Sequence, residues 1–296
     1  MINISFFSYK GGSGRTTLTY NTMPFIIQEL KPTNEKPIIL LDMDIDSKGM
    51  SYLLGRQSAI NTIQVLRGDF DSSVNPSRDI INHSFFNSLS PVGTAFGLPE
   101  ELDYAVLFVS AHATNKDNLY ISSDHNYDSI GATLKRLERL CNAYNCSALI
   151  MDTPTGSQLS SSLSLSISDV IVTVLRITKQ FREGTIEFLQ ALNKVLNDKK
   201  FIIVPNAVPE IDGIGTISVE RIFSGMEGSF KNISAKNEII VDFLTKDKRG
   251  INEVQLFKLS EANLFLESKS RNLTADEIKA IKKYEELARI IVHDEK

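Results

Sequence analysis

The sequence contains few cysteines, no long apolar run and no strong excess of charge of either sign. Its two cysteines, Cys141 and Cys146, have no paired histidines nearby, so they do not resemble a zinc site, and two thiols are too few for a disulfide framework. We therefore expect both thiols to be buried, reduced and structural, as free cysteines usually are. Reduced thiols in turn point to a cytoplasmic protein.

The lack of long apolar runs bears on membranes. No window approaches the roughly 18 consecutive apolar residues of a membrane-spanning helix. The apolar stretch within residues 1–7 is too short for a signal peptide and has neither a basic region nor a cleavage site. We expect no membrane span and no secretion signal. The formal net charge of −4 argues against a protein that coats nucleic acid by bulk electrostatics, but it leaves a local basic patch open.

The composition, 42% hydrophobic and 23% charged over 296 residues, is that of a globular protein with enough chain to bury a large core. Short apolar strands alternate with helices along most of it. We expect strands at residues 2–8, 37–41, 105–109, 148–151, 170–175 and 201–205, and helices at 16–30, 129–144, 182–196 and 274–291. This order predicts one α/β domain over residues 1–296, with a doubly wound, mostly parallel twisted sheet, helices on both faces and a C-terminal helical segment at about 260–296.

Three stretches are less regular. Residues 47–128 have weak periodicity and many Ser and Asn, so we expect a mixed segment there. The serine-rich run at 157–168 is interleaved with leucines, and we interpret it as a structured segment rather than a linker. The last helix begins with Thr274 three residues before Glu277, which is the spacing of a capping box.

The most informative motif lies between the first strand and the first helix. Its residues are Lys10, Gly11, Gly12, Ser13, Gly14, Arg15, Thr16 and Thr17. Glycines let successive backbone N–H groups turn toward phosphate oxygens, the helix N-terminus adds a positive dipole, and the Thr16 hydroxyl can ligate Mg²⁺. The usual pattern GxxxxGK(S/T) is nearly met, with Ser8 or Tyr9 in place of the first glycine and Arg15 in place of lysine.

Arg15 leaves two alternatives open. Its guanidinium keeps a positive charge and can fork onto phosphate oxygens, so nucleotide binding is expected. We expect hydrolysis of ATP to ADP and phosphate, with slow or absent hydrolysis as the alternative because the planar head does not reproduce the compact ammonium of lysine between two phosphates. The sequence therefore allows either an ATPase or a nucleotide-binding regulatory protein with little or no hydrolysis.

The whole loop resembles the deviant Walker A motif, KGGxGK(S/T), of the ParA/MinD family of P-loop ATPases. Three further segments follow in that family's order. Residues 38–44 resemble its DxD strand, residues 148–156 its Walker B and second switch, and residues 201–206 the strand that ends in an asparagine beside adenine. Four ordered motifs over residues 1–210 are more specific than a single glycine-rich loop.

The resemblance implies ATP and Mg²⁺ as cofactors and a role for each matched residue. The backbone from Gly11 to Thr16 would hold the phosphates, with Arg15 and Thr17 in the same loop. Thr16 and Asp152 would hold the metal, and Asp42 would lie close to it. Asp44 would orient the attacking water, and Lys10 would reach the nucleotide of a partner subunit. Residues 153–156 would form a switch that responds to the γ-phosphate, and Asn206 would contact adenine.

The same resemblance implies an ATP-gated homodimer that controls a protein partner in DNA partition, in cargo positioning or in a multi-gene system such as phage defence. Non-specific DNA is a further candidate partner, through a basic cluster that is interleaved with acidic residues: Lys269, Arg271, Lys279, Lys282 and Lys283. An ATP-dependent amidoligase on the same scaffold is the alternative enzyme. No N-K-x-D motif follows a strand, so ATP is expected rather than GTP. The apolar stripe of the last helix is expected to pack on the sheet, without stable membrane insertion.

Overall fold

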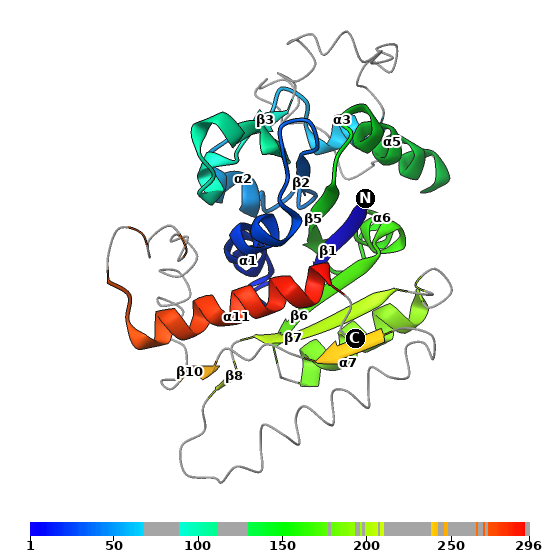
Figure 1. Ribbon diagram of the computed structural model, residues 1–296. Helices are drawn as coiled ribbons and strands as arrows, with labels where there is room; N and C mark the ends of the chain where they lie inside the picture. The colour runs from blue at the N-terminus through cyan, green and yellow to red at the C-terminus, as the bar shows by residue number, and fades with distance from the viewer. Residues whose placement is uncertain are drawn as a thin grey trace. The chain divides into compact units, whose positions relative to one another are not determined.

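The computed structural model describes residues 1–67, 89–111, 130–176, 179–192, 196, 199–206, 208–209, 238–241, 246–247, 265, 269 and 272–293. These residues belong to two compact units. Unit 1 comprises residues 1–3 and 31–154, and unit 2 comprises residues 4–30 and 155–296. Figure 1 shows their helices and strands, coloured along the chain.

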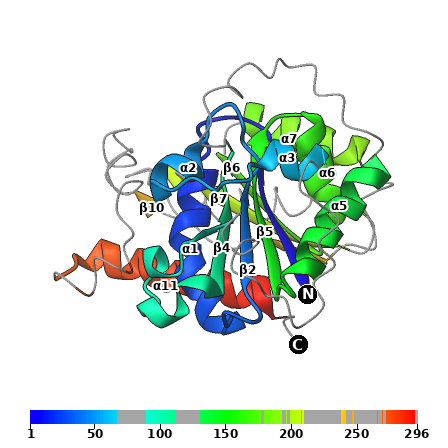
Figure 2. The same cartoon turned by 90° about the horizontal axis from the view of Figure 1, so that it is seen from above.

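The described residues of unit 1 form strands in the order β3 (Ser90–Pro91), β4 (Val106–Val109), β2 (Ile38–Asp42) and β5 (Ala148–Thr155). The strand β2 runs parallel to both β4 and β5, and only the short β3 is antiparallel. Every residue of β2 and β4 is buried, which explains why both strands are apolar except for Asp42 at the end of β2. Figure 2 shows β2 between its two parallel neighbours.

The other elements of unit 1 are short except for one helix. They are α2 (Gly49–Leu54), α3 (Thr62–Arg67), the 3₁₀ helices η1 (Thr94–Phe96) and η2 (Glu100–Ala105), and the longer α5 (Ile130–Ala143). Helices α3 and α5 pack against each other. Cys141 and Cys146 are both buried and unbridged, as expected. The Cys146 amide donates to the Cys141 carbonyl at 2.9 Å across a turn in which Asn145 has φ 50°, so the two thiols flank the end of α5.

Unit 2 has parallel strands in the order β1 (Ile2–Ser8), β6 (Val170–Arg176), β7 (Lys200–Asn206) and β9 (Glu238–Val241). A separate parallel pair joins β8 (Val208–Pro209) to β10 (Lys246–Asp247). Its helices are α1 (Arg15–Leu30), α6 (Leu159–Ile167), α7 (Lys179–Ala191) and α11 (Ala275–Val292). One apolar cluster joins the strands to α6 and α7: Phe7, Leu165, Ile171, Leu175, Leu189, Leu196, Phe201 and Ile203.

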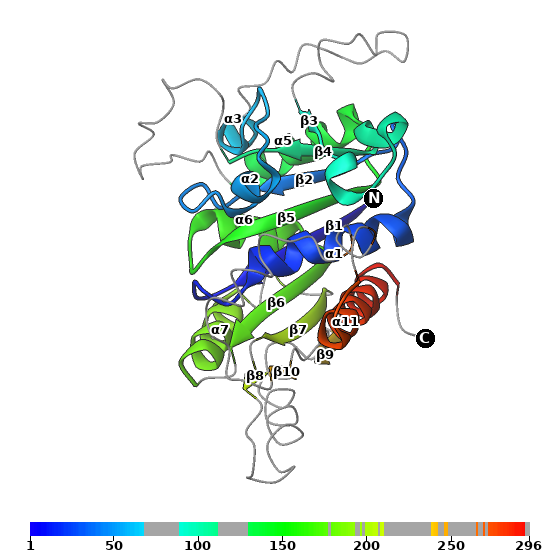
Figure 3. The same cartoon turned by 90° about the vertical axis from the view of Figure 1, so that its left-hand side faces the viewer.

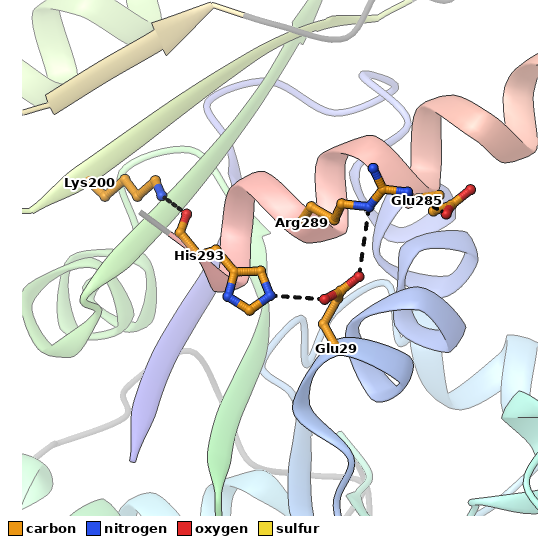
Figure 4. A network of polar contacts seen from close by, with 5 residues as sticks. All are labelled: Glu29, Lys200, Glu285, Arg289 and His293. Carbon is orange, nitrogen blue, oxygen red and sulfur yellow. Dashed lines mark hydrogen bonds and ion pairs between the residues drawn. The ribbon is translucent and has the colours of Figure 1, made fainter. Parts of the chain in front are cut away.

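Helix α11 packs against α1 and crosses it, as Figure 3 shows. The predicted capping box is confirmed, because the Thr274 hydroxyl accepts from the Glu277 amide and the Glu277 carboxylate accepts from the Thr274 amide. At its other end, a polar network ties α11 to its neighbours (Figure 4). The imidazole Nε2 of His293 lies 2.8 Å from Oε2 of Glu29 on α1, and Nζ of Lys200 on β7 donates to the His293 carbonyl at 2.6 Å. The helix therefore packs by polar contacts at its end.

These elements confirm the predicted fold class, a mostly parallel α/β fold of the P-loop NTPase kind. The expected strand at 2–8 is found with the same bounds, and the serine-rich run forms α6. Helix α7 begins at Lys179 and ends at Ala191, earlier at both ends than the expected 182–196. The mixed segment contains α2, α3, β3, η1, η2 and β4, while its residues 68–88 and 112–128 lie outside the described residues.

Candidate functional site: a phosphate loop and an acidic strand end

The glycine-rich loop of unit 2 leaves the end of β1 and enters α1 directly. Gly12 has φ 74° and Gly14 has φ 87°, a left-handed conformation that side chains rarely adopt. The Leu18 amide donates to the Gly14 carbonyl at 2.9 Å, which closes the first turn of the helix. The loop therefore presents its backbone at the N-terminus of a 16-residue helix, where unpaired N–H groups and the helix dipole favour an anion.

Two carbonyls of this loop are held by side chains from the ends of neighbouring strands. The amide Nδ2 of Asn206 donates to the Ser13 carbonyl at 2.7 Å, and Nε of Arg176 donates to the Gly12 carbonyl at 2.8 Å. The structure thus brings Asn206 to the loop that the sequence predicted, while its contact with adenine stays a prediction. Arg176 was not predicted, and a cation at the end of a strand is the only signal that the sequence offers for it.

The loop also contains a buried polar atom that suits a phosphate. Ser13 is 2% exposed, and its hydroxyl has no hydrogen-bond partner among the residues that the structure describes. Such an atom loses its hydration on burial without a replacement, which costs free energy unless a ligand supplies the contact. The residues present therefore fit a bound nucleotide phosphate.

The two basic residues of the loop differ in environment. Lys10 is half-buried, whereas Arg15 is 4% exposed, and its Nη2 lies 3.3 Å from Oγ1 of Thr16. The Thr19 hydroxyl donates to the Arg15 carbonyl at 3.0 Å, inside the first turns of α1. The guanidinium thus lies against the hydroxyl that the resemblance assigns to Mg²⁺.

Tyr9 occupies the place where the usual loop has its first glycine. Its ring lies against Gly184 of α7, so close that a Cβ at this glycine would be 2.5 Å from Tyr9 Cε1. The ring centroid also lies 5.7 Å from that of Phe188, with the planes inclined by 35°. The start of the loop is therefore packed on α7 through an aromatic contact that the sequence analysis did not identify.

Unit 1 gathers the predicted acidic residues at the end of β2 and beside it, within β5. Asp42 and Asp152 are paired in the parallel register, both are fully buried, and Asp44 follows at 5% exposure. Burial, followed by the charge of Asp152, raises the pKa of Asp42 from 3.8 to about 7. Asp44 accepts from the Ser47 amide at 3.1 Å and so closes a turn.

Two hydroxyl residues that the sequence analysis missed support Asp42. Its Oδ2 accepts from the Ser51 amide at 2.9 Å and from the Ser51 hydroxyl at 2.7 Å, and its Oδ1 accepts from the Asp44 amide at 3.2 Å. The Thr62 hydroxyl donates to the Asp42 carbonyl at 2.6 Å. The contacts from Ser51 and Asp44 hold the buried carboxylate in position, and the contact from Thr62 holds the backbone of Asp42.

The donor set of this acidic strand end suits a hard cation. Two carboxylates that repel each other are stabilised by a divalent metal, and Mg²⁺ prefers one or two carboxylates with its other positions left to water and phosphate. The described part of the chain contains no cluster of three or more His, Cys, Asp or Glu side chains that could hold a metal without such help. Asp42 and Asp152 therefore fit Mg²⁺ as part of a larger set of ligands.

The chain has a P-loop nucleoside-triphosphatase fold. Its defining features are a strand that leads through a loop with left-handed glycines into the N-terminus of a helix, within a mostly parallel α/β fold. More closely, the chain has the fold of the ParA/MinD ATPases, in agreement with the resemblance in its motifs. No protein-family model matches the sequence, and no curated protein is similar to it at a significant level. The fold is established by solved structures.

Three of these solved structures are informative. Apo McdA from Cyanothece is 13% identical over 99% of this chain and 100% of its own, with a TM-score of 0.61. The septum site-determining protein MinD from Pyrococcus horikoshii, complexed with Mg-ADP, is 16% identical over 98% and 96%, with a TM-score of 0.58. A ParA family ATPase from Chlorobium tepidum is 12% identical over 97% and 98%, with a TM-score of 0.58.

Surfaces for larger partners are less defined. In the described residues, no helix combines the length and apolar character needed to cross a lipid bilayer. Of the basic cluster near the C-terminus, Arg271 and the side chain of Lys279 lie outside the described residues. Lys283 pairs with Glu286 at 2.7 Å, and Lys269 lies over the ring of Phe265 at 4.6 Å. Binding of DNA by this cluster stays a prediction.

Proposed function

We propose that the chain is a ParA/MinD-like ATPase that binds ATP with Mg²⁺ and acts as an ATP-gated homodimeric switch for a protein partner. The observation that carries this proposal is the phosphate loop, whose left-handed glycines, helix N-terminus and buried Ser13 hydroxyl suit a phosphate chain. The Mg-ADP complex of the MinD protein, which has the same fold, is consistent with it.

In this proposal the loop backbone from Gly11 to Thr16 binds the phosphates, and Thr16, Asp152 and Asp42 hold the metal. Bound Mg²⁺ would neutralise charge on the phosphates. Asp44 orients water, Lys10 reaches the nucleotide of the second subunit, and Asn206 lies on the adenine side. These assignments rest on the matched motifs.

The first test is the solution mass by light scattering, with Mg²⁺ and a slowly hydrolysed ATP analogue compared with Mg²⁺ and ADP. We expect a monomer with ADP and a dimer with the analogue. An unchanged mass would contradict the ATP-gated switch. Lys10→Ala should leave nucleotide affinity nearly unchanged while abolishing phosphate release, whereas Lys36→Ala, at an exposed lysine of unit 1, should alter neither.

A second candidate function, nucleotide binding with little hydrolysis, is favoured by the position of Arg15. A guanidinium 3.3 Å from the Thr16 hydroxyl disfavours a divalent cation at the same oxygen by charge repulsion. If this holds, the wild-type protein binds ATP without releasing phosphate, and Arg15→Lys increases phosphate release. Equal turnover in both proteins would count against an inhibitory role for Arg15.

A further inference from the structure

Two residues at the ends of adjacent strands hold consecutive carbonyls of the phosphate loop. Arg176 is the last residue of β6 and Asn206 the last of β7, and the two are partners in the parallel register. Arg176 donates to the Gly12 carbonyl and Asn206 to the Ser13 carbonyl. The pairing of the strands therefore delivers two donors side by side to neighbouring peptide groups.

The direction of these carbonyls fixes the direction of the amides that follow them. Because a trans peptide is planar, the C=O of one residue points away from the N–H of the next. Holding the carbonyls of Gly12 and Ser13 toward the strand ends therefore turns the N–H groups of Ser13 and Gly14 to the opposite side. We propose that Arg176 and Asn206 form a brace that aims these two amides at a phosphate before the nucleotide arrives, an inference that rests on the nucleotide binding proposed above.

The fit between the loop and the brace is tight at Gly14. A Cβ added there would lie 2.3 Å from Nδ2 of Asn206, and the φ of 87° already disfavours any side chain. Asn206 therefore occupies the space that the absent side chain of Gly14 leaves. A glycine-rich loop loses much conformational entropy when it is ordered, so a brace that orders it beforehand lowers the cost of binding.

The two residues of the brace act as positioning residues. They hold backbone carbonyls, and the amides that result hold the phosphate. Arg176 also adds positive charge near the loop, which would favour any anion. The two effects of Arg176 can be distinguished by experiment, because only loss of the brace changes the order of the loop when no nucleotide is present.

The test uses the full chain with Arg176→Ala, with Arg176→Lys, and with Arg139→Ala as a control that removes the same charge from an exposed position on α5. The dissociation constants of ADP and of a slowly hydrolysed ATP analogue are measured by calorimetry. Amide hydrogen exchange of residues 11–14 is measured without nucleotide. Asn206→Ala serves as a second variant that reaches the same loop from β7.

We expect Arg176→Ala to weaken the binding of both nucleotides by about tenfold, which is the effect of losing one hydrogen bond from a charged donor. Arg176→Lys should recover most of this affinity. The loop amides of nucleotide-free Arg176→Ala and Asn206→Ala should exchange faster than in wild type, and Arg139→Ala should match wild type throughout. Unchanged exchange in both brace variants would overturn the brace, even if affinity fell through lost charge. If the wild-type protein binds neither nucleotide and the loop amides of both brace variants still exchange faster than those of wild type, the brace is retained and the proposed function is refuted.

Discussion

Replacing Asp42 by asparagine is expected to stabilise the folded protein at pH 8 and to destabilise it slightly at pH 4. Burial and the charge of Asp152 raise the pKa of Asp42 from 3.8 to about 7, so the folded state binds the proton of this carboxyl more tightly than the unfolded chain does. The contribution of Asp42 to stability is therefore greatest at low pH. It is lost as the pH rises from 3.8 through about 7.

The size of the effect follows from the same values. A tenfold change in proton affinity corresponds to about 1.4 kcal/mol, so the ionised Asp42 costs the folded state about 4 kcal/mol at pH 8. An asparagine can still accept from Ser51 but loses the bond from the Asp44 amide, which costs about 1 kcal/mol. The net stabilisation at pH 8 is then about 3 kcal/mol.

The assay is urea unfolding at pH 4, 6 and 8 in the presence of a chelator, since a bound divalent metal would itself compensate the charge. Asp46→Asn, which removes a carboxylate from an exposed position near the end of β2, is the control and should show no comparable pH dependence. A difference between Asp42→Asn and wild type that is the same at all three pH values would refute the reasoning.

Three further outcomes are expected. Gly184→Ala should lower the midpoint of thermal unfolding because its Cβ meets the Tyr9 ring, but in a Tyr9→Ala background the same change should raise the free energy of unfolding by about 1 kcal/mol, the ordinary helix preference for alanine. Thr274→Ala removes the cap of α11 and should cost about 1 kcal/mol in urea unfolding. Glu29→Gln removes the negative charge that faces Arg289 and His293, whose side chains are more than half exposed, and should cost less than about 1 kcal/mol in dilute salt and less still at high salt.

The parts of the fold that sequence predicted best are those set by local pattern. Four consecutive apolar residues before Asp42 imply burial on both faces, and β2 is buried at every position. Glycines between a first strand and a first helix imply a phosphate loop, and the structure has left-handed Gly12 and Gly14 there. The capping box at Thr274 depends on two residues one turn apart, so it too could be inferred locally.

The parts that sequence did not reveal depend on contacts between distant segments. Ser51 supports Asp42 because α2 returns the chain to the strand end, and no local pattern encodes that return. Arg176 reaches the loop only because the register of β6 with β7 ends both strands at the same level. The start of α7 was misplaced because its first turn, from Lys179, contains a single apolar residue, Phe181, which is too few to mark an apolar periodicity.

The close approach of Asn206 to Gly14 has a consequence for how this sequence can diverge. The amide of Asn206 fills the volume that a methyl group on Gly14 would need, so Gly14 cannot gain a side chain while Asn206 stays the same. Relatives that carry alanine at the position of Gly14 should carry a smaller residue at that of Asn206 or end β7 earlier. Two positions far apart in the sequence are thereby expected to evolve as a pair.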